Sequence, residues 1–297
     1  MFFLVLFYIK ILKKPKKILI IIQRSNGDVF LSLTLINALY NNLNSPQIDL
    51  LVNDDTLAVA RLLPNINFIH TFSYKKKYEG RWGQEKNLVK SIFRQYELSI
   101  NLTASDRSVI YALLASKNSI SAIEKENKKS WWKKILLTNH YYFDVTQHIL
   151  LNNLESLKFL NIEQATIQSS PNISEEVMDT VRKKLSIFGI SDFIIFHPST
   201  QYRYKIYPQL LRNKLLSNLS NLGISILITG SRNQIDTEIK KELPSLPNII
   251  DFIGETTLEE YFALSKLSLA YIGMDTLNMH IAASQPISIS KDDISNE

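Results

Sequence analysis

The sequence predicts an α/β protein built from two Rossmann-like domains, each with a parallel sheet. Three observations support this prediction. Short apolar runs alternate with segments of helical periodicity along most of the 297 residues, as in βαβ units. A polar stretch at 161–172, which contains Pro171, separates two such series. Polar and turn-forming residues follow most of the apolar runs, which is where parallel α/β sheets bind ligands.

The first series begins with a continuous apolar run at 17–22, which predicts a buried strand. Residues 23–28 predict a loop, and the spacing of apolar residues at 29–43 predicts a helix. Further strands are expected at 47–52, 67–72, 97–102 and 119–123, with helices at 54–63, 85–95, 105–115 and 146–160. The lysine-rich and aromatic segment 124–147 breaks this rhythm. Trp beside Lys suits a membrane interface or an anionic ligand, and a solvated surface loop is the alternative.

The second series repeats the alternation after residue 172. Strands are expected at 192–197, 224–229, 248–253 and 267–272, with helices at 175–188, 208–222, 234–243 and from 257 onward. Thr257 and Glu260 have the spacing of a capping box at the start of a helix. A last helix is expected to begin near Asp275, directly after a buried strand and the turn at Gly273. An unpaired helix start of this kind favours an anion.

These series predict three regions: an N-terminal segment at 1–16, one α/β domain at 17–165 and a second at 172–297. Two such domains facing one another would form a cleft with ligands at the carboxyl ends of the strands. Residues 1–12 are nearly all apolar and lysines follow at 13–17, which suggests a short interfacial helix on anionic headgroups. A first helix packed on the protein surface is the alternative.

Composition narrows the range of functions. The chain has no cysteine, which excludes disulfides and thiolate chemistry. Its net charge of +6 favours an anionic partner. The lysines are scattered and no recognition module is present, so the sequence does not indicate a nucleic-acid-binding protein. The dinucleotide-binding G-x-G-x-x-G and P-loop motifs are absent, and no His, Asp and Glu residues have metal-ligand spacing.

The candidate site residues follow predicted strands. The first domain contributes one candidate, Asp28; the alternative interpretation is that this aspartate is only the N-cap of a helix. The second domain offers Ser199, Thr200, Lys205, Gly230, Ser231, Thr256, Asp275 and Thr276. This pattern fits a nucleotide diphosphate in the second domain and a carboxylate facing it from the first.

Four motifs carry a resemblance to a known family: 17–29, which contains Asp28, 196–200 with Lys205 and Pro208, 228–231, and 273–283. Their order and spacing resemble those of the bacterial lipopolysaccharide heptosyltransferases of glycosyltransferase family 9, from about residue 16 to 284. The resemblance implies the two-domain glycosyltransferase-B fold. It also implies transfer of heptose from ADP-heptose to the inner core of lipopolysaccharide, with inversion and without an obligatory metal or other cofactor.

The resemblance implies roles for individual residues. Asp28 matches the general base, which would take the proton of the acceptor hydroxyl. Lys205 matches a lysine at the donor phosphates, where a cation offsets the charge of the leaving ADP; one more solvated lysine is the alternative. Ser199 and Thr200 match hydroxyls near the same diphosphate.

At the last helix, Asp275 would hold a heptose hydroxyl and Thr276 would face phosphate, and His280 matches a third donor-binding position. The segment around Thr256 matches one that flanks adenine, and Gly230 and Ser231 belong to the same donor side. His197 is expected to be structural.

The resemblance therefore implies two partners, a nucleotide-sugar donor and a lipid-anchored lipopolysaccharide acceptor. The expected location is cytoplasmic, with peripheral contact at the cytoplasmic face of the inner membrane as the further expectation. The sequence departs from the family pattern at Leu277, where members usually have Gly, and in the polar tail after Ser284. That tail suggests an incomplete C-terminus. Two alternatives remain for the function: the chain is a catalytically inactive remnant of such an enzyme, or it is a transferase that uses another nucleotide-sugar.

Overall fold

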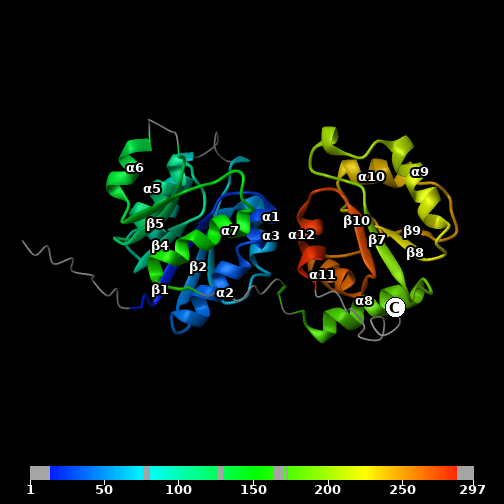
Figure 1. The fold of residues 1–297 in the computed structure, drawn as a ribbon, viewed down its shortest axis with the longest axis horizontal. Coiled ribbons are helices and arrows are strands. Elements are labelled where there is room, and N and C mark those ends of the chain that lie inside the picture. The colour runs from blue at the N-terminus through cyan, green and yellow to red at the C-terminus, as the bar shows by residue number, and fades with distance from the viewer. Residues whose placement is uncertain (1–13, 76–80, 126–129, 164–169, 172, 286–297) are drawn as a thin grey trace, which may run out of the picture. The chain divides into compact units, whose positions relative to one another are not determined.

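A computed structural model describes residues 14–75, 81–125, 130–163, 170–171 and 173–285. It divides into two compact units, Met1–Gln168 and Ser169–Glu297 (Figure 1). Predictions for the apolar N-terminal segment, for the lysines at 128–129 and for the polar C-terminal tail fall outside the described residues. No helix among the described residues has the length and apolar character needed to cross a membrane.

The first unit is a six-stranded parallel sheet with the strand order β3-β2-β1-β4-β5-β6. Its strands are β1 (Lys17–Ile22), β2 (Gln47–Asn53), β3 (Ile66–Phe72), β4 (Leu98–Asn101), β5 (Ser119–Ile123) and β6 (Asn139–Tyr142). Its helices are α1 (Asn26–Phe30), α2 (Leu33–Asn42), α3 (Leu57–Ala60), α4 (Arg81–Ile92), α5 (Asp106–Ala115), α6 (Trp131–Leu136) and α7 (Ile149–Leu154), with 3-10 turns at Asp54–Thr56 and Glu155–Leu160.

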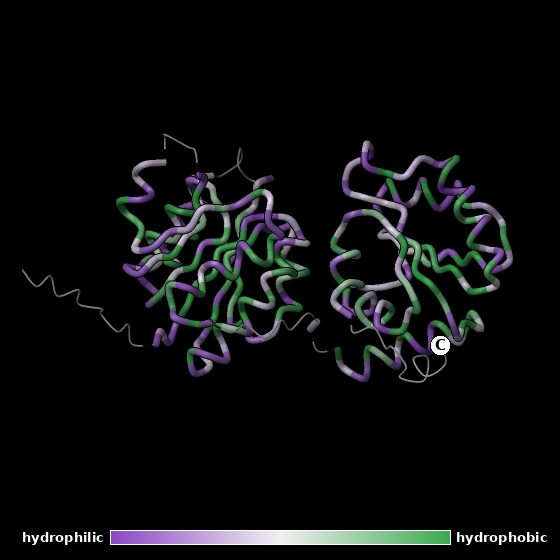
Figure 2. The backbone as a smooth tube through the Cα atoms, viewed as in Figure 1, coloured by the Kyte–Doolittle hydropathy of each residue, from purple (hydrophilic) through white to green (hydrophobic). Residues whose placement is uncertain are grey.

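Strand β1 is the centre of this unit because Ile18 to Ile22 are all buried, so both faces of the sheet are covered. On one face, Leu19 and Ile21 pack in a cluster with residues of α4 and α5, among them Ile92 and Tyr111. Figure 2 shows that the strands at the middle of each unit are largely hydrophobic.

Two predictions for the first unit are wrong. The segment 23–43 is not a loop followed by one helix, since α1 already begins at Asn26 and a break at Leu31 and Ser32 separates it from α2. The segment 124–147 does not interrupt the α/β alternation as predicted, because it contains α6 and the edge strand β6. Strand β6, with the sequence Asn-His-Tyr-Tyr, has no aliphatic run, and the six residues of α6 are fewer than two helical turns, so neither shows an apolar period.

The second unit is a four-stranded parallel sheet with the order β10-β7-β8-β9. Its strands are β7 (Phe193–His197), β8 (Ser225–Ile228), β9 (Ile249–Asp251) and β10 (Ala270–Gly273). Its helices are α8 (Glu175–Ile187), α9 (Gln209–Ser220), α10 (Gln234–Lys241), α11 (Leu258–Leu267) and α12 (Leu277–Ser284), with a 3-10 turn, η5, at Arg203–Lys205.

The predicted strands and helices of this unit are present, with ends that differ by a few residues. The capping box of Thr257 and Glu260 is confirmed at the start of α11. Strand β10 is only half-buried and lies at the sheet edge, so the prediction that it is buried is wrong. The N-cap of α12 is Thr276, one residue after the expected start at Asp275.

Candidate functional site

Asp28 lies in the first turn of α1, directly after the carboxyl end of β1. Ser25 is the N-cap of this helix, and Asp28 occupies the third helical position of a capping box. The Asp28 Oδ2 atom accepts hydrogen bonds from the Ser25 backbone N at 3.2 Å and from Ser25 Oγ at 2.8 Å. The alternative interpretation of Asp28 as an N-cap is therefore wrong, because Ser25 is the N-cap; Asp28 caps the helix reciprocally from the third position, and this capping box fixes its carboxylate after β1.

An arginine that the sequence analysis did not single out completes this arrangement. Arg24 Nε lies 3.1 Å from Asp28 Oδ2. The Arg24 guanidinium also lies over the ring of Phe143, with Cζ 4.8 Å from the ring centroid, as in a cation–π contact. Phe143 follows β6, the strand that periodicity did not predict, so the sequence held no signal for this contact.

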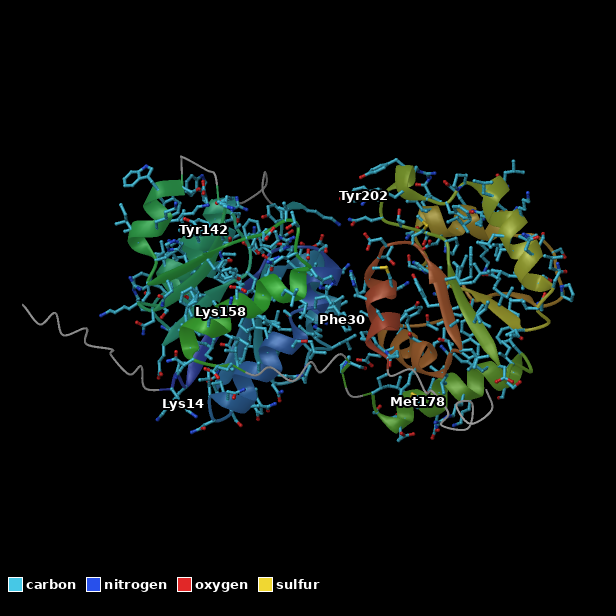
Figure 3. The ribbon with its side chains drawn as sticks, in the orientation of Figure 1. Lys14, Phe30, Tyr142, Lys158, Met178 and Tyr202 are labelled. Carbon is cyan, nitrogen blue, oxygen red and sulfur yellow. The ribbon has the colours of Figure 1, made fainter. Side chains whose placement is uncertain are left out.

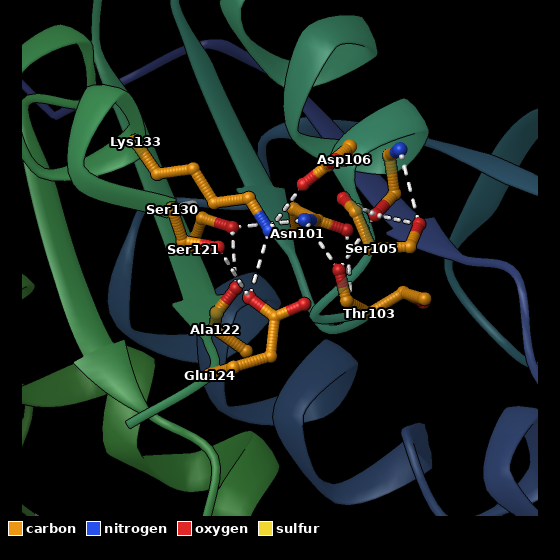
Figure 4. Close-up of polar contacts among 10 residues, drawn as sticks. Asn101, Thr103, Ser105, Asp106, Ser121, Ala122, Glu124, Ser130 and Lys133 are labelled. Carbon is orange, nitrogen blue, oxygen red and sulfur yellow. Dashed lines mark hydrogen bonds and ion pairs between the residues drawn. The ribbon is translucent and has the colours of Figure 1, made fainter. Parts of the chain in front are cut away.

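A polar cluster occupies the same edge of the sheet, at the ends of β4 and β5. Figure 4 shows Lys133 of α6 between two carboxylates, with Nζ 2.7 Å from Asp106 Oδ1 and 2.7 Å from Glu124 Oε2. Lys133 is fully buried, whereas Asp106 is well exposed. Beside it, Asn101 Nδ2 donates to the Thr103 carbonyl oxygen and to Ser121 Oγ. This cluster anchors α6 to the sheet.

The carboxyl ends of the second sheet lie in register. Gly273 at the end of β10 pairs with His197 at the end of β7. The Thr229 backbone N donates to the Phe196 carbonyl oxygen at 3.0 Å, and the Gly254 N donates to the Gly230 carbonyl oxygen at 2.9 Å. The loops after all four strands therefore begin along one edge of this unit, as the sequence predicted.

His197 is buried at this edge and has a full set of polar contacts. Its Nδ1 lies 3.1 Å from Thr229 Oγ1, and its Nε2 lies 3.5 Å from Ser199 Oγ. Asn278 of α12 places its Nδ2 3.0 Å from the ring nitrogens. Burial lowers the pKa of His197 to about 4, although Asp236 opposes this shift. His197 is thus neutral at pH 7, and these contacts agree with the expected structural role.

Ser199 and Thr200 lie in the buried first part of the loop after β7. Thr200 Oγ1 donates to the Tyr202 carbonyl oxygen at 2.7 Å and accepts from the Tyr202 N, so it closes a local turn. Lys205 ends η5, with its Nζ 6.0 Å from the centre of the Tyr202 ring. Tyr202, labelled in Figure 3, stacks on Tyr204. These rings and Lys205 are exposed on the loop.

Gly230 and Ser231 form the start of the loop after β8, and a buried carboxylate organises them. Asp236 Oδ2 accepts from the Ser231 N at 2.6 Å, from Ser231 Oγ at 2.8 Å and from Asn233 Nδ2 at 3.0 Å. A side chain at Gly230 would meet Asp236, because a Cβ there would lie 2.9 Å from its Cγ. Asp236 was missed because a single aspartate inside a predicted helix carries no distinguishing pattern.

The remaining predicted residues lie after β9 and β10. Thr256 directly precedes the N-cap of α11 and is half-buried. Asp275 is exposed, and Thr276 caps α12 through a hydrogen bond from the Asn278 N to its Oγ1 at 3.3 Å. Burial, with Asp275 nearby, raises the pKa of Tyr271 to about 12. His280 lies one turn into α12 and is half-buried.

In the described part of the chain, no group of three or more His, Cys, Asp and Glu side chains is arranged to hold a metal ion. The expectation that the reaction needs no obligatory metal remains a prediction. The assignment of Asp28 to catalysis and of the second-unit residues to donor binding also remains a prediction, since the structure contains no ligand.

Two units, each with a parallel sheet flanked by helices, define a two-domain α/β protein of Rossmann-like architecture. The chain belongs to glycosyltransferase family 9: the sequence pattern of "Glycosyltransferase family 9 (heptosyltransferase)" matches residues 86–287. It is therefore a glycosyltransferase, and the predicted family and fold class are confirmed.

Individual relatives agree with this assignment. Lipopolysaccharide heptosyltransferase 3 of Escherichia coli (strain K12) is 26% identical over 273 residues, which are 88% of this chain and 77% of that protein. The structure of the glycosyl transferase family 9 from Veillonella parvula DSM 2008 matches with a TM-score of 0.76 at 18% identity, over 91% of this chain and 78% of that one. The structure of Escherichia coli heptosyltransferase WaaC with ADP matches with a TM-score of 0.68 at 14% identity, over 91% of this chain and 85% of the WaaC chain.

Proposed function

We propose that this family 9 enzyme transfers heptose from ADP-heptose to the inner core of lipopolysaccharide, with inversion at the anomeric carbon. The observation that carries the proposal is the match over 88% of the chain to a lipopolysaccharide heptosyltransferase. The same fold is found in a WaaC structure with ADP-2-deoxy-2-fluoro heptose, with a TM-score of 0.70. Both the donor and the acceptor in this proposal come from these relatives.

In this proposal Asp28 is the general base. Its carboxylate takes the proton of an acceptor hydroxyl while that oxygen attacks the anomeric carbon and the bond to ADP breaks. A single displacement of this kind inverts the anomeric configuration. The capping box and Arg24 support the role because they hold the carboxylate in a defined position after β1.

The strand-end loops of the second unit would bind the donor. The exposed ammonium group of Lys205 would lie at the diphosphate, where it offsets the negative charge that grows on ADP as the sugar leaves. The N-terminal turn of α12 would face a phosphate through Thr276, with Asp275 at a heptose hydroxyl. Ser199, Thr200 and the Gly230–Ser231 turn would complete this surface. His280 and the segment around Thr256 would also belong to the donor site.

The experiment is an assay of ADP release from ADP-heptose with heptose-deficient core lipopolysaccharide as acceptor. Acceptor-dependent release, with a product whose anomeric configuration is inverted by NMR, supports the proposal. Equal or faster turnover of UDP-glucose or GDP-mannose would instead identify a transferase with another donor. Binding of ADP-heptose without release, in the presence of acceptor, would indicate the inactive alternative.

We also propose that the enzyme works at the cytoplasmic face of the inner membrane, in peripheral contact with it. Helix α6 supports this because Trp131 and Ile135 are 64% and 69% exposed beside Lys134. Trp131→Ala should weaken co-sedimentation with anionic liposomes without changing ADP binding. Leu210→Ala, at an 82% exposed apolar position of α9, is the matched control. Unchanged co-sedimentation of the Trp131 variant would exclude α6 from this contact.

A further inference from the structure

Arg24 contacts the carboxylate of Asp28 and, at the same time, the ring of Phe143, the residue that follows β6. We propose that Arg24 is a positioning residue for sugar transfer, which holds Asp28 by one oxygen so that the other oxygen is directed to the acceptor hydroxyl. The inference rests on the proposed role of Asp28 as the general base, and it assigns Phe143 as the support of Arg24.

The contacts of Asp28 are distributed unevenly between its two oxygens. Oδ2 accepts from the Ser25 N at 3.2 Å and from Ser25 Oγ at 2.8 Å, and Arg24 Nε lies 3.1 Å from the same atom. A carboxylate oxygen that accepts two hydrogen bonds and also pairs with a guanidinium has little capacity left for a further donor. The proton of an acceptor hydroxyl would therefore be taken by Oδ1.

Arg24 is itself held in place. Its Nε atom is buried and makes an ion pair, not a hydrogen bond, with Asp28. The guanidinium Cζ lies 4.8 Å from the centre of the Phe143 ring. The Phe143 backbone N donates to the Ile123 carbonyl oxygen at 2.9 Å, which fixes this ring to the end of β5. A planar guanidinium that both stacks on a ring and pairs with a carboxylate cannot be replaced by the smaller ammonium of lysine without loss of one contact.

Removal of Arg24 should change the orientation of the Asp28 carboxylate and leave the carboxylate itself in place. Without Arg24, Asp28 keeps its two hydrogen bonds from Ser25, so the carboxylate remains at the end of β1. It loses the ion pair on Oδ2, so rotation about its Cβ–Cγ bond is opposed by the two Ser25 hydrogen bonds and no longer by Arg24. A base that samples several orientations is correctly placed for a smaller fraction of the time, which lowers kcat and leaves donor binding unchanged.

A purely structural role is the competing explanation, because Arg24 also links the segment after β1 to β6. Four variants distinguish the two roles: Arg24→Ala, Arg24→Lys, Asp28→Ala and the double variant Arg24→Ala/Asp28→Ala. Each is assayed for kcat and KM with ADP-heptose, with and without guanidinium ion at a concentration below denaturation. Arg182→Ala is the matched control, since Arg182 pairs with Asp179 at 2.9 Å on the exposed face of α8.

A positioning role predicts that Arg24→Ala lowers kcat roughly 10- to 100-fold, the effect of a small misplacement of the base, with KM for ADP-heptose within about twofold. Guanidinium should restore part of the lost kcat. The kcat of Arg24→Lys should lie between those of the wild type and Arg24→Ala. The double variant should turn over no more slowly than Asp28→Ala. Arg182→Ala should turn over normally. Guanidinium should not increase its rate.

Wild-type turnover by Arg24→Ala would overturn the inference. The inference would also be overturned if guanidinium did not restore the kcat of Arg24→Ala and if the decrease in kcat of the double variant equalled the sum, in free energy, of the decreases of the two single variants. Wild-type turnover by Asp28→Ala is a separate result, which would overturn the proposed base itself.

Discussion

The buried carboxylate of Asp236 accepts two hydrogen bonds from Ser231, one from its backbone N at 2.6 Å and one from its Oγ at 2.8 Å. The Ser231 hydroxyl, expected from the sequence to serve the donor, is thus engaged within its own loop. This loop would therefore contact a ligand mainly through its backbone, whose conformation depends on Asp236. The same relationship explains why residue 230 is glycine.

Replacement of Asp236 by alanine should destabilise the protein and weaken ADP binding. The variant removes a buried carboxylate that accepts hydrogen bonds from the Ser231 N and from the Ser231 hydroxyl, and the loss of these charge-assisted bonds costs about 1 to 3 kcal/mol. Urea unfolding and calorimetric titration with ADP measure the two effects. Asp179→Ala, which removes an exposed ion pair on α8, is the control and should change the unfolding free energy by less than about 1 kcal/mol. Equal stability of both variants would show that Asp236 does not organise the loop.

Gly230→Ala should also destabilise the protein. The added Cβ would lie 2.9 Å from Asp236 Cγ, a side chain that its hydrogen bonds hold in place. We expect a loss of about 1 to 3 kcal/mol. Gly83→Ala in α4 has open space around its Cβ and should be neutral or stabilising by up to about 1 kcal/mol. Similar melting temperatures for the two variants would contradict the close approach at Gly230.

His197 should make the stability depend on pH. Its pKa of about 4 in the folded state lies below the ordinary value of 6.5, so between these values the unfolded chain binds more protons. The contribution of His197 is present above pH 6.5 and is lost as the pH falls toward 4, by up to about 3 kcal/mol. Urea unfolding at pH 7 and pH 4.5 should show a smaller decrease for His197→Gln than for the wild type. An identical decrease would mean that this ring does not resist protonation.

Lys133→Ala should be among the more destabilising substitutions in the first unit. It removes a fully buried side chain and leaves Asp106 and Glu124 without their shared cation, while both carboxylates keep some contact with water. We expect a loss of about 2 to 4 kcal/mol in the unfolding free energy, measured with urea. Lys158→Ala is the control, because that exposed lysine pairs only with Glu155 one turn away. A loss for Lys133→Ala no larger than for this control would contradict the anchoring role.

The sequence predicted those parts of the fold that depend on long apolar runs. The five isoleucine and leucine residues at 18–22 could only be a buried strand, and the structure places them at the centre of the first sheet. The capping box at Thr257 was visible because its two residues stand at a fixed spacing. Strand β6 was missed, since its polar and aromatic residues lie at an edge and need no apolar pattern.

The positions of the candidate residues at strand ends were predicted from the sequence, but their hydrogen-bond and packing partners were not. Asp28 was singled out in the first unit, and Ser231 and Thr276 in the second, because residues that follow the strands of a parallel sheet lie at the carboxyl edge of that sheet. Their partners are set by tertiary packing. Arg24 reaches Phe143 across the sheet, and Asn278 reaches His197 over a separation of 81 residues. No local pattern encodes contacts of this length.

The role of Asp28 can be decided by one comparison between the wild type and Asp28→Asn, a variant of nearly the same shape that cannot accept a proton as a base. The assay is release of ADP from ADP-heptose in the presence of a heptose-deficient core acceptor, with the affinity for ADP-heptose measured by titration. We expect the variant to bind ADP-heptose as tightly as the wild type and to release ADP at least about 100-fold more slowly. Release at the wild-type rate would show that another group takes the proton.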